Sequence, residues 1–341
     1  MDRIRYSRQI LFAPIGEPGQ QKLLDSKVAI VGMGALGTVL ANHMVRAGVG
    51  YVRIIDRDFV EASNLQRQML YDEQDAKLGL PKAAAAADKL RLINSGVTVE
   101  PVIADLNWQN AEQLLADVDL VLDGTDNFQV RFLINDVCVK HHIPWVYGGG
   151  VSAHGMTVTI LPEETPCLRC LFESAPAPGT TQTCDTAGVI GPLIHIVASF
   201  QAVEAMKILV GDTESLRPSM LNLSIWDHYL TEINVANARR ADCPCCGKKQ
   251  FEYLEPRSGT ETTSLCGRDT IQIVPAERLA LNLDLLENRL TPLGKVERNK
   301  FLLRFEPGEQ RMVIFPDGRV LVQGTDDPAL AKTLYAKYIG M

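Results

Sequence analysis

The sequence predicts an α/β fold in which a mostly parallel sheet is flanked by helices, followed by a cysteine-bearing extension and a small C-terminal α+β domain. Three observations support this prediction. Short apolar runs alternate with helical patterns through about the first 150 residues, which is typical of a parallel sheet covered on both faces. The first run opens into a glycine-rich turn before a helix, and two C-x-x-C pairs lie further along the chain.

The N-terminal part contains five expected strands separated by helices. The strands are expected at 27–32, 51–56, 97–102, 119–127 (broken at Gly124) and 143–150. Helices are expected through about Ala47, over 80–93 and over 128–142. Pro81 suits the first helical position, where its missing N–H costs little. This alternation predicts a Rossmann-like sheet.

The pattern changes towards the C-terminus. A strand is expected at 156–161 and a long apolar helix from about 188 to 210, and the polar stretch 253–264 is interpreted as a linker. Beyond the linker, strands are expected at 269–274, 300–305, 311–315 and 319–324, with helices near 276–290 and 327–338. We therefore expect two domains, 1–250 and 265–341.

Composition limits the possible classes of function. The net charge of −7 argues against nucleic acid or an anionic membrane as the main partner. The N-terminal segment 1–12 is too charged for a secretory signal, and the apolar run 28–41 is too short to span a bilayer. We therefore expect a cytoplasmic protein, in which 8 cysteines indicate metal binding or thiol chemistry more than disulfides.

The motif GMGALG follows an expected strand and precedes an expected helix. Its Gly32, Gly34 and Gly37 have the G-x-G-x-x-G spacing, which lets a phosphate approach the backbone at a helix N-terminus. Asp56 ends the next strand, where a carboxylate can accept hydrogen bonds from ribose hydroxyls. The motif predicts a nucleotide site, and a tight turn without a ligand is the alternative.

Three polar residues suggest that the nucleotide carries a triphosphate. Asn64 and Arg67 lie in the loop NLQRQ, and Lys82 lies in the first turn of a helix, where a cation is unfavourable for the helix dipole. Solvated surface charges are the alternative for Arg67 and Lys82. A triphosphate needs such cations, whereas an NAD(P)-dependent oxidoreductase, the rival class of enzyme, does not. A zinc-stapled binding scaffold without catalysis is the third class.

Acidic residues follow the fourth strand. Asp126 lies just past its carboxyl end, the edge of open α/β sheets at which ligands bind. Asp123 and Asp126 together could hold Mg²⁺ through oxygen ligands. Alternatively, Asp126 and Asn127 cap the helix that begins near Phe128, and both roles can hold at once.

Four cysteines form two C-x-x-C pairs, Cys167 with Cys170 and Cys243 with Cys246. Four thiolates are the ligand set of a closed tetrahedral zinc site. Because the pairs are far apart in the sequence, zinc would staple the end of the core domain onto the crossover loop, giving a zinc-stapled extension. A redox-active C-x-x-C is the rival interpretation. Cys245 is left over and is expected to be a bystander.

Cys184 belongs to neither pair. It lies in a loop rich in Gly, Thr and Pro, just before a long helix. A thiolate is stabilised near a helix N-terminus, so Cys184 is a candidate nucleophile, with a spare loop thiol as the alternative. Cys138, inside an expected helix, is interpreted as packing.

The chain resembles the ThiF/MoeB/HesA family of adenylyltransferases, bacterial relatives of ubiquitin-activating enzymes, over roughly residues 4–250. The resemblance rests on RYSRQI, the glycine loop, NLQRQ, the Pro-Lys pair, TDN, both C-x-x-C pairs and TCDTAG. The C-terminal domain, with SLCGRDTIQI and FPDGRVLVQG, is similar to that of thiazole-biosynthesis (ThiF-type) members. One departure is Ala35, where the family usually has glycine.

The resemblance implies an activity. Members activate the C-terminal glycine carboxylate of a ubiquitin-like sulfur-carrier protein, which ends in Gly-Gly. The carboxylate attacks the α-phosphate of MgATP and gives an acyl-adenylate and pyrophosphate. The C-terminal domain favours thiamine (thiazole) biosynthesis, and the molybdopterin branch (MoeB-type) is the alternative within the family.

The resemblance also implies residue roles. Carried over by motif, the phosphate loop is Gly32, Gly34 and Gly37, the ribose contact is Asp56, the triphosphate contacts are Asn64, Arg67 and Lys82, and the Mg²⁺ ligand is Asp126. Arg8 would reach the phosphates of the neighbouring subunit's ATP, which implies a homodimer. Cys184 matches a cysteine that is implicated in covalent linkage to the carrier.

Overall fold

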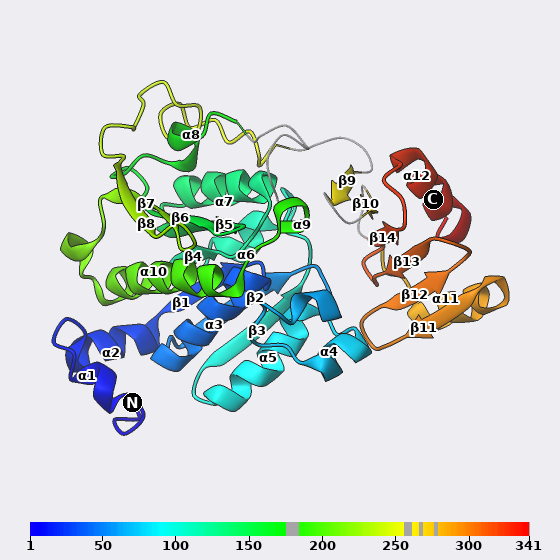
Figure 1. The fold of residues 1–341 in the computed structure, drawn as a ribbon, viewed down its shortest axis with the longest axis horizontal. Helices are drawn as coiled ribbons and strands as arrows, with labels where there is room; N and C mark the ends of the chain where they lie inside the picture. Colours follow the sequence, from blue (N-terminus) through cyan, green and yellow to red (C-terminus); the bar gives the residue numbers. More distant parts are fainter. Residues whose placement is uncertain (175–183, 256–260, 266–268, 276–278, 341) are drawn as a thin grey trace. The chain divides into compact units, whose positions relative to one another are not determined.

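A computed structural model describes residues 1–174, 184–255, 261–265, 269–275 and 279–340 (Figure 1). The chain divides into two compact units. The first unit is Met1–Pro176 with Ala187–Pro256, and the second is Ala177–Thr186 with Arg257–Met341.

The first unit is built on a sheet of eight strands in the order β3-β2-β1-β4-β5-β6-β7-β8. The strands are β1 (Lys27–Val31), β2 (Tyr51–Asp56), β3 (Thr98–Ile103), β4 (Leu120–Asp123), β5 (Trp145–Val151), β6 (His154–Ile160), β7 (Ser219–Ser224) and β8 (Tyr229–Asn234). Neighbours from β3 to β5 pair in parallel, and those from β5 to β8 pair antiparallel. The predicted α/β fold with a mostly parallel sheet is confirmed.

Helices cover both faces of this sheet (Figure 1). Core residues of α3 (Ala35–Ala47), α5 (Lys82–Ile93) and α10 (Gly191–Val210) pack on one face, and those of α6 (Ala111–Leu115) and α7 (Phe128–Lys140) pack on the other. Along β1, Val28 and Ile30 join the first core, whereas Ala29 and Val31 join the second. Because both faces are buried, the strand is continuously apolar and not alternating.

Shorter helices complete the first unit. They are α1 (Ser7–Ile10), α2 (Gly16–Asp25), α4 (Glu73–Leu78), α8 (Leu168–Leu171) and two 3₁₀ turns (Ala62–Asn64 and Thr213–Ser215), and α9 (Cys184–Ala187) lies where the two units divide. Pro81 precedes α5 as its N-cap and does not take the first helical position.

The helix α10 is long and apolar enough to cross a membrane by length and composition alone. It instead packs against α3, β5 and β6, and more than half of its most apolar stretch is buried within the protein. Its apolar character is therefore explained by its place in the core.

The strands β7 and β8 extend the sheet beyond what the sequence predicted. All six residues of β8 are exposed, so this edge strand has no alternation of apolar and polar residues. Pairing with β7 makes it a strand, and that pairing leaves no signal in a single sequence.

The second unit holds a six-stranded antiparallel sheet in the order β11-β12-β13-β14-β10-β9. The strands are β9 (Glu261–Leu265), β10 (Thr270–Val274), β11 (Lys295–Arg298), β12 (Leu303–Glu306), β13 (Arg311–Ile314) and β14 (Val320–Gln323). The helices α11 (Leu283–Leu290) and α12 (Pro328–Tyr338) and a 3₁₀ turn (Thr291–Leu293) accompany it. The predicted small α+β domain is confirmed.

Three details of this unit differ from expectation. The linker interpretation of 253–264 is wrong at its end, because β9 pairs there with β10. The strand β11 was not predicted, since only one of its four residues is apolar. The helix expected near 276–290 begins only at Leu283, where the Asn282 side chain accepts hydrogen bonds from the backbone N–H groups of the first turn.

Candidate functional site

The glycine loop joins β1 to α3 and requires glycine at two positions. Gly32 has a φ of +88°, and its N–H donates to the Ile55 carbonyl at 2.7 Å. A Cβ on Gly37 would lie 1.8 Å from the Gly32 carbonyl oxygen, so only glycine lets α3 begin this close to the loop. Gly34 is the N-cap of α3 and has no protein atom this close to a hypothetical Cβ, the nearest being Gln68 Nε2 at 3.9 Å. The backbone is therefore open to a ligand at Gly34.

Asp56 connects the end of β2 to the glycine loop. Its Oδ2 accepts a hydrogen bond from Met33 N at 2.6 Å, and its Oδ1 accepts one from Asp58 N at 2.6 Å. Burial raises the pKa of Asp56 above its ordinary value, and the charge of Lys82 opposes that rise. Each carboxylate oxygen keeps a further lone pair, so the residue fits the predicted ribose contact.

Lys82 is the first residue of α5 and is held against the segment that follows β2. Its N–H donates to the Asp58 carbonyl at 2.9 Å, and Val60 N donates to the Leu80 carbonyl at 2.8 Å. Only 4% of the Lys82 side chain is exposed, and its Nζ lies 3.4 Å from Asp58 Oδ2. The alternative of a solvated surface charge is therefore wrong for Lys82.

Asn64 and Arg67 lie in the loop between β2 and α4. Asn64 is buried, and its Oδ1 accepts a hydrogen bond from Glu61 N at 3.1 Å, which closes the 3₁₀ turn. Arg67 is half-buried, and its Nη1 donates to the Ser63 carbonyl at 2.9 Å. Asn64 thus shapes the turn that presents Arg67, and its contact with a nucleotide stays a prediction.

The structure separates the two aspartates that follow β4. Asp123 is fully buried: its Oδ2 accepts from Arg131 Nε at 2.9 Å, and its Oδ1 accepts from Thr125 N at 2.8 Å. It is therefore not available to Mg²⁺. Asn127 caps α7, whereas Asp126 is exposed and makes no hydrogen bond or ion pair with the described residues. The role of Mg²⁺ ligand stays a prediction for Asp126 alone.

These elements meet at the carboxyl edge of the parallel strands. Gly191, the first residue of α10, packs there so closely that a Cβ on it would lie 3.2 Å from the Gln66 carbonyl oxygen. The edge therefore combines a helix N-terminus, a buried ammonium and a guanidinium, which together suit a triphosphate.

Arg8 lies elsewhere. Its neighbour Gln9 donates through Nε2 to the carbonyl of Ala47 at 3.0 Å, so α1 lies at the C-terminal end of α3. The 13 residues of α3 span about 20 Å between that end and the glycine loop. The exposed Arg8 side chain is too short to reach the glycine loop of its own chain.

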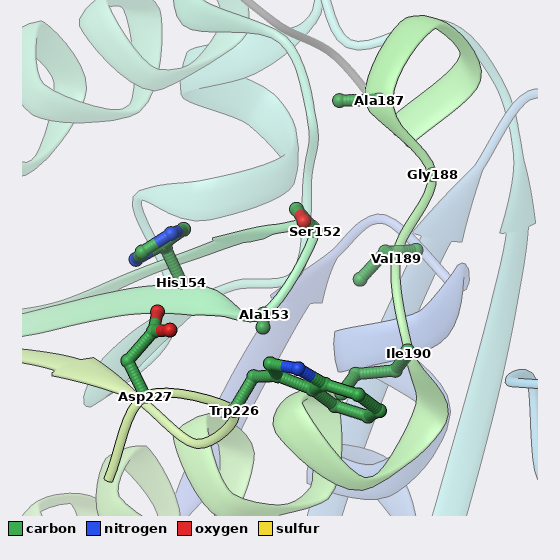
Figure 2. A pocket seen from close by; sticks show the side chains of 9 residues that line it. All are labelled: Ser152, Ala153, His154, Ala187, Gly188, Val189, Ile190, Trp226 and Asp227. Carbon is green, nitrogen blue, oxygen red and sulfur yellow. The ribbon is translucent and has the colours of Figure 1, made fainter. Parts of the chain in front are cut away.

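A cavity of about 390 Å³ lies at the same edge of the sheet, where β5 turns into β6. The backbone pairs across it, with Ser152 N donating to the Gly188 carbonyl at 2.7 Å and Ile190 N donating to the Ser152 carbonyl at 3.1 Å. Figure 2 shows Trp226 beside Ile190 on one side, with His154 and Asp227 on the other. The lining residues are Ser152, Ala153, His154, Ala187, Gly188, Val189, Ile190, Trp226 and Asp227.

The four predicted zinc ligands come together. Their Sγ atoms all lie within 4.8 Å of one another. The Sγ separations are 3.7 Å for Cys167 and Cys243, 3.4 Å for Cys170 and Cys246, and 3.9 Å for Cys167 and Cys170. Tetrahedral zinc with bonds of about 2.3 Å places its sulfurs about 3.8 Å apart, so this cluster fits the ion.

Cys245 lies outside the set of four clustered ligands, as expected, but it has partners that the sequence did not suggest. It is buried, and its Sγ accepts a hydrogen bond from Asn135 Nδ2 at 3.2 Å. Asn135 Oδ1 in turn accepts from Leu168 N at 2.7 Å, so a single side chain of α7 holds both cysteine segments. These contacts orient the ligand segments from outside the cluster.

The next residue of α7, Asp136, adds a further contact to the cysteine region. Its Oδ2 accepts a hydrogen bond from Tyr253 N at 2.9 Å, and burial raises the pKa of this carboxyl to about 6. Sequence reasoning missed Asn135 and Asp136. The available signal was two adjacent polar residues in the middle of the otherwise apolar segment FLINDVCVK.

Two further cysteines among the described residues are not members of the group of four. Cys184 is half-buried and is the first residue of the short helix α9. Its proposed nucleophilic role stays a prediction. Cys138 is fully buried in the core on α7, where burial raises the pKa of its thiol well above the ordinary value, and this fits the packing interpretation.

The model of the ThiF family matches residues 6–245. The chain belongs to the ThiF family. It is 44% identical to a sulfur carrier protein ThiS adenylyltransferase of Bacillus subtilis, over 98% of this chain and 99% of that protein. It is 40% identical to the SAMP-activating enzyme E1 of Haloferax volcanii, over 76% of this chain and 95% of that protein.

Solved structures support the fold of the ThiF-family unit. The structure of Escherichia coli MccB with ATP matches with a TM-score of 0.62 and 23% identity, covering 71% of this chain and 74% of that one. At this level of identity the likeness establishes the fold alone.

We expect one zinc ion per chain on the four clustered cysteines. Cys167→Ser should lose the metal and unfold at a lower temperature, because a structural zinc contributes folding free energy directly. Cys245→Ser should keep the metal, since serine can both accept from Asn135 and donate a hydrogen bond. Metal analysis and thermal unfolding measure both variants. Full zinc in Cys167→Ser, or none in the native protein, would contradict the assignment.

Proposed function

We propose that the chain is an ATP-dependent adenylyltransferase that activates the C-terminal glycine carboxylate of a ubiquitin-like sulfur-carrier protein. The observation that carries this proposal is the 44% identity to the Bacillus subtilis ThiS adenylyltransferase, which extends over nearly the full length of both chains. The buried Lys82 and the half-buried Arg67 at the carboxyl edge of the sheet support it.

The residues at that edge match the needs of adenylyl transfer. A carboxylate oxygen attacks the α-phosphorus and the bond to pyrophosphate breaks, so catalysis depends on positioning and on neutralising charge. The N-terminus of α3 at Gly34, the Lys82 ammonium and Arg67 hold and neutralise the phosphates. Asp126 would hold Mg²⁺, which would supply further positive charge to the phosphates.

We place the reaction in the thiazole branch of thiamine biosynthesis, in the cytoplasm. The Bacillus relative aligns through the C-terminal unit, whereas the Haloferax relative aligns with 76% of this chain. Adenylation for molybdopterin synthesis is the second candidate, because it uses the same core motifs. An NAD(P)-dependent oxidoreductase is disfavoured by the buried Lys82, which a dinucleotide does not need.

We propose a homodimer in which Arg8 completes the site of the neighbouring subunit. The length of α3 keeps Arg8 from the glycine loop of its own chain. Large apolar side chains next to it in sequence are exposed, with 73% of Leu11 and 60% of Phe12 accessible. A second subunit that covers this surface would bury Leu11 and Phe12. It would also place Arg8 beside the nucleotide that the second subunit binds.

We propose that the carrier's C-terminal tail approaches along the cavity of Figure 2. Ile190, which lines the cavity, precedes Gly191 in the sequence, and Gly191 packs on the loop that bears Arg67. A Gly-Gly terminus has no side chains and suits a passage bounded by the backbone of Ser152 and Gly188.

Cys184, at the start of α9, is proposed to act after adenylation, in covalent linkage to the carrier.

Carrier-dependent exchange of labelled pyrophosphate into ATP tests the function. Lys82→Ala and Arg67→Ala should each lower the exchange rate by about 10²-fold or more, since each removes a preorganised cation. Arg91→Ala is the control, because this exposed cation of α5 pairs with the exposed Asp88 at 3.0 Å. No exchange with any Gly-Gly-terminated carrier, or tight binding of NADH, would overturn the proposal.

Mixed dimers test the shared site. Arg8→Ala and Asp126→Ala should each be nearly inactive. An equal mixture should recover about a quarter of the native exchange rate, because half of the dimers are mixed and each mixed dimer has one intact site of two. Native mass spectrometry confirms subunit exchange. Mixed dimers without activity would contradict a site completed by the partner.

The role of Cys184 is tested separately from adenylation. Cys184→Ala should keep carrier-dependent exchange near the native rate, because adenylation needs no nucleophilic thiol. It should lose the thiol-sensitive covalent adduct with the carrier that we expect mass spectrometry to detect when the native protein is mixed with carrier, ATP and a sulfur donor. Cys245→Ser is the matched control and should keep the adduct. An unchanged adduct in Cys184→Ala would assign the linkage to another cysteine.

A further inference from the structure

The Lys82 ammonium has an acidic partner within the chain. Its Nζ lies 3.4 Å from Asp58 Oδ2, and 4% of the lysine and 21% of the aspartate side chain are exposed. The main chain fixes this pair, because Lys82 N donates to the carbonyl of Asp58 at 2.9 Å. Attraction between charges is stronger in such a partly desolvated place than in water.

Asp58 is also fixed to the glycine loop through Asp56. The N–H of Asp58 donates to Asp56 Oδ1 at 2.6 Å, and Met33 N donates to the other oxygen of Asp56 at 2.6 Å. The segment that carries the Asp58 carboxylate is therefore fixed to the glycine loop. One oxygen of this carboxylate faces Lys82, and the other lies 3.9 Å from Arg57 Nε.

We propose that Asp58 is the counter-ion of Lys82 in the free protein, that the phosphates of ATP replace it, and that Asp58 thereby limits the affinity for ATP. This inference rests on the proposed function, in which Lys82 holds the triphosphate. The attraction between Lys82 and Asp58 is strong in the free protein and weaker in the complex with ATP. The difference in its free energy between the two states therefore opposes ATP binding.

The exchange has a physical reason. A buried ammonium without a counter-ion costs several kcal/mol, so the free protein needs an acid beside Lys82. An ammonium has three donors and can turn towards a phosphate oxygen without moving its stem. Asp58 is then an acidic group beside a polyanion, which favours release of the nucleotide. Asp58 is thus a positioning residue that acts through Lys82.

Calorimetric titration of MgATP into the full-length protein tests the inference. Asp58→Asn keeps the shape and the backbone bond to Lys82 but removes the charge, and it should bind ATP about tenfold more tightly. Its kcat for carrier adenylation should fall while its KM for ATP also falls, a pattern that partial unfolding does not produce. Asp58→Glu should bind ATP like the native protein.

Two comparisons separate the possible causes. Asp88→Asn is the control, because it removes the same charge from α5 at an exposed pair with Arg91. The gain in affinity from Asp58→Asn should largely disappear in a Lys82→Ala background. An equal gain in both backgrounds, or unchanged or weaker binding in the single variant, would overturn the counter-ion role. A native protein that binds no ATP would instead overturn the proposed function itself.

Discussion

The contact between Gly37 and the Gly32 carbonyl is the constraint on which the nucleotide edge depends. Any side chain at position 37 would overlap that oxygen, so α3 can start this close to β1 only with glycine. The contact places the N-terminus of α3 directly at the carboxyl edge of the sheet. Asp56 then locks the loop through Met33, and the same carboxylate fixes Asp58 and hence Lys82. One backbone contact thus orders a series of charged groups.

The charges of the edge come from segments that are far apart in the sequence. Lys82 is buried at the start of α5, and Arg67 is presented by a turn that Asn64 closes. Acidic residues lie among these cations. Asp58 forms an ion pair with Lys82, and Asp126 is exposed just after β4. Because the local cations are partly neutralised by these acids, a triphosphate needs further positive charge. A metal ion and an arginine from a partner subunit are two sources that suit this need.

The predictable parts of the structure were those with local signals. Apolar runs and the glycine spacing revealed strands β1 to β6 and the loop, and cysteine spacing revealed the cluster of four. The edge strand β8 carries no pattern, because all of its residues are exposed and only pairing defines it. Asn135 and Asp136 act on segments far away in the sequence, and such contacts leave no trace in local spacing. The burial of Asp123 by Arg131 was hidden for the same reason.

The cysteine cluster and the nucleotide edge are connected through α7. The helix begins after the Asn127 cap, next to Asp126 in the sequence. About two turns later, Asn135 forms hydrogen bonds with both cysteine segments. A metal that closes the cluster therefore also holds α7, and with it the position of Asp126.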